Sequence, residues 1–509
     1  MAHNSYYRPE WTCGRYNAEH RVALMYNLIG GTSNFFEDYS ADVISHILNA
    51  GRNGKVDAIE IANATGIDIE SIRDFFQLLI QNGLLCTCIP TKKDIAAYRS
   101  SVCQDNIKER TAPQTTQEKL PIDTSNAEQA YYEAVDDGST ITSVMFELTY
   151  NCSEKCVHCY NPGATRNDSE ISHRGDREEL QLDDYRRIID DLCNHGLVKV
   201  CLSGGDPFSK PIVWDIIDYL YQKEVAFDIF TNGQRIVDKV DCLVDYYPRL
   251  VGVSIYSGIP EDHDVITRVP ESWEKSMKVV KRLSELAVPM NIKCCVMQPN
   301  LHSYYLVNDL ARSLGAQPQF EINISDSNEG DRCARSLRLT EEQLQVVLRD
   351  DNIPMYVGPE APNYGGQPRK MDVGPCGAGS TTFCISPEGN LKPCCSFPMT
   401  FGNLRENDIS EILHGNDCLT NWRKFTLQES EECGQHDYCR YCNLCPGLAW
   451  SEHGDYRKAS ENCCYMAKVR HRLAHRMMEG YDPLQGNELV SALKALPKTK
   501  VNLQRNYDI

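Results

Sequence analysis

The chain has 509 residues, of which 41% are hydrophobic and 24% are charged, and these proportions are typical of folded soluble proteins and not of disordered chains. Its length predicts two to four domains. The 71 acidic residues outnumber the 52 basic ones, and the net charge of -19 repels a phosphate backbone, which excludes nucleic acid as an expected partner.

The first residues show no basic stretch followed by an apolar run, and no segment contains the roughly 20 apolar residues that cross a bilayer. We therefore expect a cytoplasmic protein without a membrane partner. Because reducing compartments keep thiols free, the 24 cysteines are not expected to form disulfides. Ligation of metal explains the clustered ones best. The cysteines in apolar runs are expected to be buried small side chains, namely Cys193, Cys201, Cys242, Cys294 and Cys295.

Residues 12–90 are predicted to form a small domain. Three apolar runs between 11 and 36, separated by polar turn residues, predict three short strands. Helical periodicity follows from 38 to 51, with Asp38 or Ser40 as the cap, and two more helices complete the domain. Strands followed by three helices suggest a winged helix. DNA binding is not expected, because the last two helices carry more acidic than basic residues.

Residues 91–135 are polar and have little to bury, which predicts a linker or a loosely draped segment. A second domain is expected over 140–350, where an apolar run at 142–149 precedes five strand-like runs that alternate with helical stretches. This alternation predicts an α/β fold with a parallel sheet, and a partial or full (β/α) barrel is its natural closure. Active residues then lie at the C-terminal ends of the strands.

Three cysteines follow the first predicted barrel strand with the spacing Cys-x3-Cys-x2-Cys, namely Cys152, Cys156 and Cys159. Three thiolates from one loop can hold three irons of a 4Fe-4S cluster and leave the fourth iron open to a small molecule. A zinc knuckle is the structural alternative. It needs a fourth ligand at matching spacing, and His158 lies inside the motif, badly placed for that role.

This motif resembles the signature of the radical S-adenosylmethionine (SAM) superfamily, which implies a partial (β/α)6 barrel. The resemblance also implies that the open iron binds the amino and carboxylate groups of SAM. One electron, from a donor such as flavodoxin or ferredoxin, then cleaves the sulfonium and gives a 5′-deoxyadenosyl radical that abstracts hydrogen. His158 takes the place of an aromatic residue that contacts adenine in the family.

Later strand ends are similar to further motifs of this family. Gly204, Gly205 and Asp206 match a GGEP stretch whose backbone binds the methionine ammonium of SAM, and paired glycines permit that close approach. Asp206 departs from the family's Glu and is one methylene shorter. By resemblance, Ser254 meets the ribose or carboxylate of SAM, and Arg268 pairs with the carboxylate. Taken alone, Ser254 is equally well explained as the end of a strand.

A second set of cysteines crowds residues 370–470, a segment expected to lack a core of its own without metal. Residues 471–509 are predicted to be a C-terminal helix and tail. The crowded cysteines resemble the SPASM extension of radical enzymes, which holds up to two auxiliary 4Fe-4S clusters, and zinc is the structural competitor. They are Cys376, Cys384, Cys394, Cys395, Cys433, Cys439, Cys442, Cys445, Cys463 and Cys464.

The resemblance implies three 4Fe-4S clusters in all. Its first auxiliary cluster would take Cys376, Cys384 and Cys394, and its second would take Cys439, Cys442, Cys445 and Cys464, with Cys463 as an alternative to the last. In the family a later cysteine returns to the first auxiliary cluster, and the stretch after Cys445 has none. Either Cys395 or Cys433 substitutes, or this cluster keeps an open iron that could bind a substrate thiolate.

The order of recognition unit, radical barrel and auxiliary-cluster domain is similar to that of enzymes that modify ribosomally made peptides. In these, an N-terminal winged helix binds the leader of a precursor peptide, which adds a strand beside the wing. A Cys thioether cross-link is the first hypothesis for the product. The alternatives are a carbon–carbon or carbon–oxygen link, epimerisation, a sulfatase-maturing oxidase, or a non-enzymatic iron-sulfur regulator.

Overall fold

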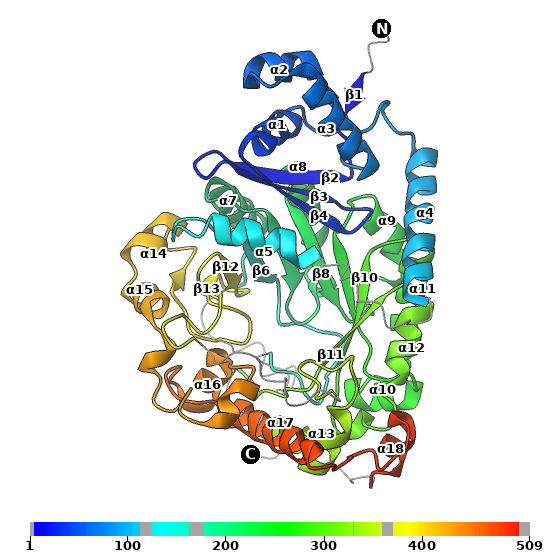
Figure 1. Ribbon diagram of the computed structural model, residues 1–509, viewed down its shortest axis with the longest axis vertical. Coiled ribbons are helices and arrows are strands. Elements are labelled where there is room, and N and C mark those ends of the chain that lie inside the picture. Colours follow the sequence, from blue (N-terminus) through cyan, green and yellow to red (C-terminus); the bar gives the residue numbers. More distant parts are fainter. Residues whose placement is uncertain (1–4, 112–123, 162–177, 329, 359–369, 498–509) are drawn as a thin grey trace.

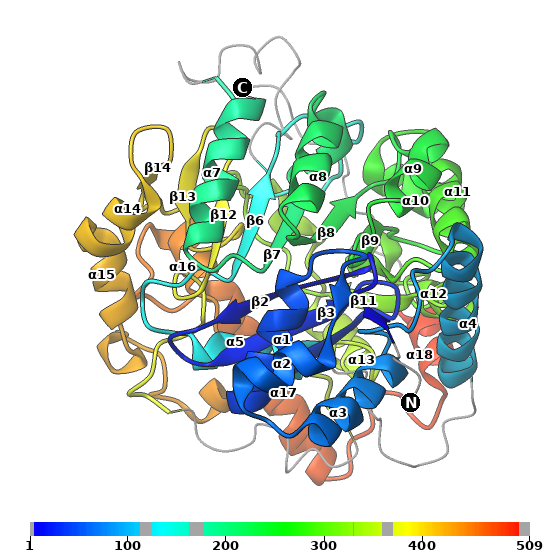
Figure 2. The ribbon, with the colours of Figure 1, turned by 90° about the horizontal axis from the view of Figure 1, so that it is seen from above.

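The computed structural model describes residues 5–111, 124–161, 178–328, 330–358 and 370–497 (Figure 1). An N-terminal unit lies at one end of a central sheet, helices cover the outer face of that sheet, and the C-terminal part lies beside its other end (Figures 1 and 2). Among the described helices, none is long and apolar enough to span a membrane.

The N-terminal unit contains the strands and helices that the sequence predicts. The antiparallel sheet β2-β3-β4 and the short pair β1-β5 accompany three helices. The cap prediction is wrong, because helix α1 begins at Asp38 with Glu37 as its cap, and the Ser40 hydroxyl bonds the backbone of Glu37. The elements are β1 (Tyr6–Tyr7), β2 (Thr12–Asn17), β3 (Val22–Asn27), β4 (Thr32–Glu37), α1 (Asp38–Asn49), β5 (Lys55–Val56), α2 (Ala58–Thr65) and α3 (Ile69–Gln81).

The polar segment that the sequence suggests as a linker contains two helices, α4 (Lys92–Thr111) and α5 (Thr124–Ala134). Among the residues whose burial is described, each helix buries few side chains, and this explains why composition alone does not reveal them. Ile95 of α4, Tyr131 of α5 and Val135 just after α5 are buried in an apolar cluster. That cluster also includes residues of β3, Val198 just before β7 and Ala226, the first residue of β8, so these helices join the N-terminal unit to the barrel.

The central sheet confirms the predicted parallel arrangement. Six strands lie side by side in chain order and are parallel throughout, because each is followed by a helical crossover. The strands are β6 (Ser143–Glu147), β7 (Lys199–Ser203), β8 (Ala226–Thr231), β9 (Leu250–Ser254), β10 (Met290–Cys295) and β11 (Gln317–Glu321). The accompanying helices are α7 (Leu182–Asn194), α8 (Val213–Gln222), α9 (Val240–Val244), α10 (Pro260–Thr267), α11 (Ser272–Glu285) and α12 (Leu306–Ser313).

The cysteine-rich segment continues the same sheet. Strand β12 (Thr382–Ile385) pairs in parallel with β6, and β13 (Asn390–Lys392) and β14 (Gly402–Asn403) follow as antiparallel neighbours. The sheet therefore has nine strands among the described residues, in the order β11-β10-β9-β8-β7-β6-β12-β13-β14. The remaining helices are α13 (Glu341–Val347), α14 (Ile409–Gly415), α15 (Asp417–Lys424), α16 (Pro446–His453), α17 (Glu461–Met478) and α18 (Leu489–Ala495).

A buried network of charges fixes helix α5 under the N-terminal ends of the barrel strands. The carboxylate of Glu128 accepts from the Lys199 ammonium at 2.6 Å and from the Arg249 guanidinium at 3.0 Å. Arg249 also donates to Asp228 at 2.7 Å. These side chains are at most 14% exposed, so each charge is stabilised by its ion-pair partner and hardly by water.

Replacing Glu128 with Ala is expected to destabilise the protein, because the buried Lys199 ammonium would lose its carboxylate. Breaking a buried ion pair costs about 3 kcal/mol. The apparent melting temperature measures this loss. Glu133→Ala is the matched control, since Glu133 lies exposed on the same helix. Equal melting temperatures for the two variants would contradict the role of the network.

Candidate active site and cysteine clusters

The loop that follows β6 carries Cys152, Cys156 and Cys159 at the C-terminal end of the sheet, where the sequence predicts the active residues. The end of α10 holds this loop by two backbone hydrogen bonds. The N–H of Lys155 donates to the carbonyl of Thr267, and the N–H of Val157 donates to that of Ile266, both at 3.0 Å. The three cysteines are thus presented on a fixed turn.

The turn after β7 holds the same loop from the other side. The N–H of Gly205 donates to the carbonyl of Thr149 at 2.7 Å, and the N–H of Asp206 donates to that of Asn151 at 3.0 Å. A Cβ on Gly204 would lie 2.3 Å from the Thr149 oxygen, and one on Gly205 would lie 2.5 Å from the Asn151 oxygen. Gly204 also has a φ of 124°, which favours glycine. The glycine pair therefore lets the cysteine loop pack closely against the turn after β7. The sequence did not predict this role of the two glycines.

Two buried carboxyl groups lie at this loop with unused oxygens. Asp206 is fully buried and accepts from the Thr231 hydroxyl at 2.8 Å, while its Oδ2 has no hydrogen-bond partner. Glu154 lies between Cys152 and Cys156 in the loop, and its Oε1 has no hydrogen-bond partner either. Burial raises the pKa of Asp206 to about 6 and that of Glu154 to about 8. A bound cation such as the ammonium of SAM would satisfy these oxygens, so the residues present fit the predicted cofactor.

Aromatic side chains flank the cysteine loop. The ring of His158 meets the ring of Tyr256 edge-on, with centroids 4.7 Å apart, and Tyr256 stacks on His263 at 5.5 Å. The Tyr256 hydroxyl lies 3.9 Å from the Cys156 sulfur. Sequence reasoning missed Tyr256, although its place two residues after β9 was a signal. The structure thus places His158 among aromatic side chains at the cysteine loop, and aromatic rings of this kind can pack against an adenine.

The structure places the other two predicted SAM contacts near the same end of the sheet. Ser254 is the last residue of β9. Arg268 ends α10 in the left-handed conformation and directly follows the two residues whose carbonyls hold the cysteine loop. Both side chains are half-buried.

Lys293 of β10 places a positive charge inside the barrel. Its Nζ lies 3.2 Å from the centre of the Phe230 ring, and its stem crosses Gly252, where a Cβ would lie 3.1 Å from the Lys293 Cδ. Among the described residues, no carboxylate forms an ion pair with it, whereas Lys392 pairs with Glu147 at 2.5 Å. Burial lowers the pKa of Lys293. This ammonium is available to an acidic group of a bound molecule.

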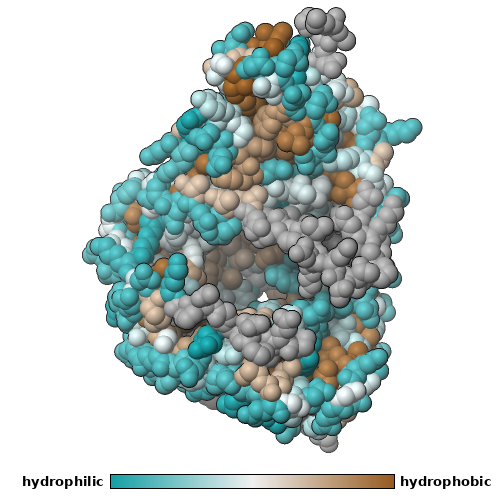
Figure 3. Space-filling model, viewed as in Figure 1, coloured by the Kyte–Doolittle hydropathy of each residue, from teal (hydrophilic) through white to brown (hydrophobic). Residues whose placement is uncertain are grey.

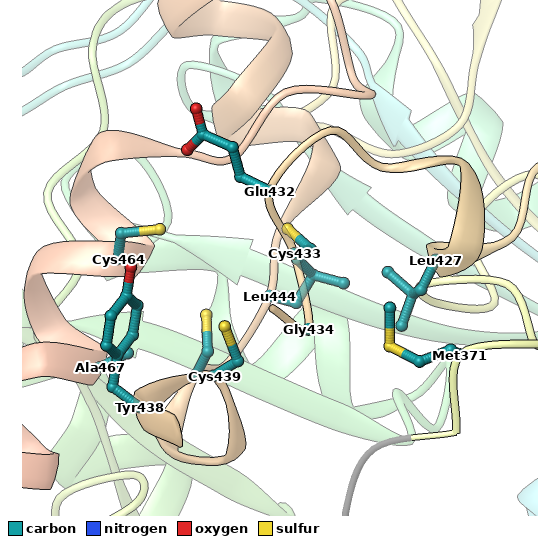
Figure 4. Close-up of a pocket in the computed structure, with 11 residues that line it drawn as sticks. Met371, Leu427, Glu432, Cys433, Gly434, Tyr438, Cys439, Leu444, Cys464 and Ala467 are labelled. Atoms are coloured by element: carbon teal, nitrogen blue, oxygen red, sulfur yellow. The ribbon is translucent and has the colours of Figure 1, made fainter. Parts of the chain in front are cut away.

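Four cysteines of the C-terminal part line one cavity, shown in Figure 4. They are Cys433, Cys439, Cys442 and Cys464. The labelled sulfurs of Cys433, Cys439 and Cys464 turn toward a common space (Figure 4). Cys464 begins the second turn of α17. Its neighbour Cys463 is buried and does not line the cavity, but its thiol interacts with that of Cys442, and its carbonyl lies 3.8 Å from the Cys442 sulfur.

Cys445 is not among the residues that line the cavity of Figure 4, but it lines a neighbouring cavity together with Cys433. Burial raises the pKa of the Cys445 thiol to about 11, and the nearby Cys463 and Cys376 raise it too. Burial also raises the pKa of Cys394, together with its neighbours Cys395, Cys445 and Cys376. The thiols of Cys376, Cys394 and Cys445 therefore lie near one another, and Cys445 also lies near Cys463 and Cys433.

Cys384 and Cys395 approach the barrel interior. Cys384 lies fully buried on β12, opposite Met145 of β6. Burial and the negative charge of Glu147 raise the pKa of Cys384. Cys395 lies close enough to the Tyr160 hydroxyl to raise its pKa. Cys384 thus belongs to the sheet itself, and Cys395 lies near it.

The cysteines are spread more widely than a single zinc ion requires. Among the described residues, no three cysteine sulfurs lie within 4.8 Å of one another. A zinc ion with Zn–S bonds of about 2.3 Å draws its sulfurs closer than that.

Comparison with known families agrees with the two predicted domains. Residues 146–301 match the radical SAM superfamily, and residues 376–446 match the iron-sulfur cluster-binding domain called SPASM. These matches confirm the predicted resemblance to radical SAM enzymes with a SPASM domain.

Known proteins align with most of the chain. The antilisterial bacteriocin subtilosin biosynthesis protein AlbA of Bacillus subtilis is 24% identical over 328 residues, which cover 64% of this chain and 70% of AlbA. The AdoMet-dependent heme synthase of Methanosarcina barkeri is 25% identical over 347 residues, which cover 63% of this chain and 96% of the synthase. Streptococcus suis SuiB bound to precursor peptide SuiA has a similar fold, with a TM-score of 0.53, 14% identity and coverage of 90% of this chain and 99% of SuiB.

Gly205→Ala is expected to loosen the cysteine loop, because the added Cβ would lie 2.5 Å from the carbonyl oxygen of Asn151. Hydrogen exchange of the amides in residues 148–161 should become faster. Gly415→Ala is the control, since a Cβ there meets nothing within 4 Å. Unchanged exchange in the Gly205 variant would show that the loop does not depend on this contact.

Proposed function

With a radical SAM domain and a SPASM domain in one chain, we propose that the protein is a peptide maturase that abstracts hydrogen from a residue of a precursor peptide and forms a cross-link. The observation that carries the radical step is the fixed loop of Cys152, Cys156 and Cys159 beside the unused oxygens of Asp206 and Glu154. Bound there, SAM and a 4Fe-4S cluster supply the 5′-deoxyadenosyl radical.

The residues around the loop then have distinct roles in this proposal. Asp206 and Glu154 accept hydrogen bonds from the ammonium of SAM, and His158 and Tyr256 pack against its adenine. Ser254 and Arg268 bind its ribose or carboxylate. Each of these interactions orients SAM without taking part in bond cleavage, which fits a reaction whose radical chemistry the cofactors supply.

We propose a revised ligand set for the two auxiliary clusters. Cys433, Cys439, Cys442 and Cys464 would hold one cluster, because they line one cavity. Cys376, Cys394 and Cys445 would hold the other, because these thiols lie near enough for Cys376 to raise the pKa values of the other two. Cys384 would complete the second set, or that cluster would keep an open iron for a substrate thiolate.

The N-terminal unit supports a peptide as the substrate. Strand β4 lies at the edge of its sheet, and Phe36 of β4 contacts Phe75 of α3 with ring centroids 5.9 Å apart. Leu78, one helical turn further along α3, is 53% exposed. Hydrophobic residues also gather on this part of the surface, above a hollow in the same face (Figure 3). An extended leader could add a strand to β4 and place apolar side chains against α3.

A Cys thioether is the product we propose first. An auxiliary cluster with three cysteine ligands would offer an iron to a peptide thiolate and take up the second electron. A porphyrin substrate is the alternative that the heme synthase relative suggests. The N-terminal unit favours a peptide, because an edge strand beside an apolar helix face recognises extended backbone and not a macrocycle.

Cluster-reconstituted and reduced protein is expected to convert SAM to 5′-deoxyadenosine, measured by chromatography. The control is the triple variant Cys152→Ala, Cys156→Ala, Cys159→Ala, which removes the ligands of the radical cluster and should give none. Co-expression with a candidate precursor, any short peptide found to be encoded beside the gene, should then lower the mass of that peptide by two hydrogens per link. A link that also blocks alkylation of one cysteine is a thioether, and an unchanged peptide mass would contradict cross-linking.

The ligand sets predict how iron content responds to substitution. Cys433→Ala and Cys439→Ala should each remove one cluster, about four of about twelve irons per chain, and combining them should remove no more. Combining Cys445→Ala with Cys439→Ala should remove twice as much iron as either substitution alone, since two clusters then each lose a ligand. Cys418→Ala, an exposed cysteine on α15, is the control. Additive loss for Cys433 and Cys439 would contradict the revised sets.

A further inference from the structure

Asn232 connects the end of strand β8 to the cysteine loop. Its side-chain Nδ2 donates to the Cys152 sulfur at 3.3 Å and to the Ser153 hydroxyl at 3.3 Å. The residue is buried, with 6% of its surface exposed. A buried amide that points a donor at a metal-binding sulfur has a direct electrostatic effect on that sulfur.

The orientation of this amide is fixed by the backbone. The N–H of Gln234 donates to Oδ1 of Asn232 at 3.0 Å, so the oxygen must face Gln234 and the NH2 group must face the loop. The carbonyl of Asn232 accepts from the Ser276 hydroxyl at 2.6 Å, which fixes the main chain. The donor is therefore held in place before any cofactor binds.

Cys152 receives a second donor from its own loop. The N–H of Glu154 lies 3.4 Å from the Cys152 sulfur. A cysteine sulfur that ligates iron carries negative charge, and that charge grows when the cluster takes up an electron. Hydrogen bonds to cluster sulfurs stabilise the added charge and raise the reduction potential.

We propose that Asn232 is a positioning residue that raises the reduction potential of the cluster held by Cys152, Cys156 and Cys159. This inference rests on the proposed function. The electron comes from a flavodoxin- or ferredoxin-type donor, enters the cluster and needs no proton. The Asn232 hydrogen bond lowers the energy of the reduced form, so a weaker donor suffices to start the cleavage of SAM.

The test is a redox titration of the full-length reconstituted protein, followed by electron paramagnetic resonance. The signal of the radical cluster is the one that changes when SAM is added. Asn232→Leu keeps the size of the side chain and removes the donor, and Asn232→Ala is the second variant. Both should move the midpoint to a more negative potential. At the wild-type midpoint, the ratio of reduced to oxidised cluster should fall at least about threefold.

Ser153→Ala is the matched control. It removes the other acceptor of the Asn232 amide and leaves the bond to Cys152, so its midpoint should equal that of the wild type. A wild-type midpoint in both Asn232 variants would overturn the inference. A wild-type protein with no SAM-sensitive signal would instead overturn the proposed function, so the two failures are distinguishable.

Discussion

The close contact between two backbone turns is the constraint on which the active end of this protein depends. The turn at Gly204 and Gly205 donates two amides to the loop that carries the cysteines, at a separation that leaves no room for a Cβ. Strands β6 and β7 lie side by side, so their C-terminal turns meet at the same edge of the sheet. The cysteine loop therefore takes its shape from neighbouring backbone before it meets metal.

Charge is distributed unevenly along the barrel interior. At the N-terminal ends of the strands, Glu128 and Asp228 neutralise the cations that face inward. Higher in the barrel, the ammonium of Lys293 lies over the Phe230 ring and forms no ion pair with a carboxylate of the described residues. At the C-terminal ends, Asp206 and Glu154 hold unused acceptor oxygens. The two ends of the strands thus differ: ion pairs balance the charges at the N-terminal ends, whereas buried carboxyl groups with unused acceptor oxygens lie at the C-terminal ends.

Much of this arrangement follows from local sequence. The apolar runs of β7 to β11 and the helices between them were predictable because short apolar runs alternate with helical stretches, although β11 itself contains no β-branched residue. The cysteine motif after β6 was predictable because its three ligands lie within eight residues of one another. Helices α4 and α5 were missed because their buried residues, such as Ile95 and Tyr131, are few among polar ones. The assignment of the C-terminal cysteines to individual clusters was not predictable, because spacing along a chain does not say which distant cysteines meet. The contact of the glycine pair with the cysteine loop could not be predicted from the sequence either, since it depends on the register between β6 and β7.

The pairing of β12 with β6 makes the C-terminal part a continuation of the barrel sheet. Without it, β6 would be an edge strand in a parallel sheet that is buried on both faces, and its free backbone groups would be open to pairing with another chain. The two cofactor-binding regions are therefore one cooperative folding unit, and neither is expected to remain a stable monomer when expressed alone. Because hydrogen bonds join the two regions, their relative position is set when the chain folds and does not depend on a moving hinge.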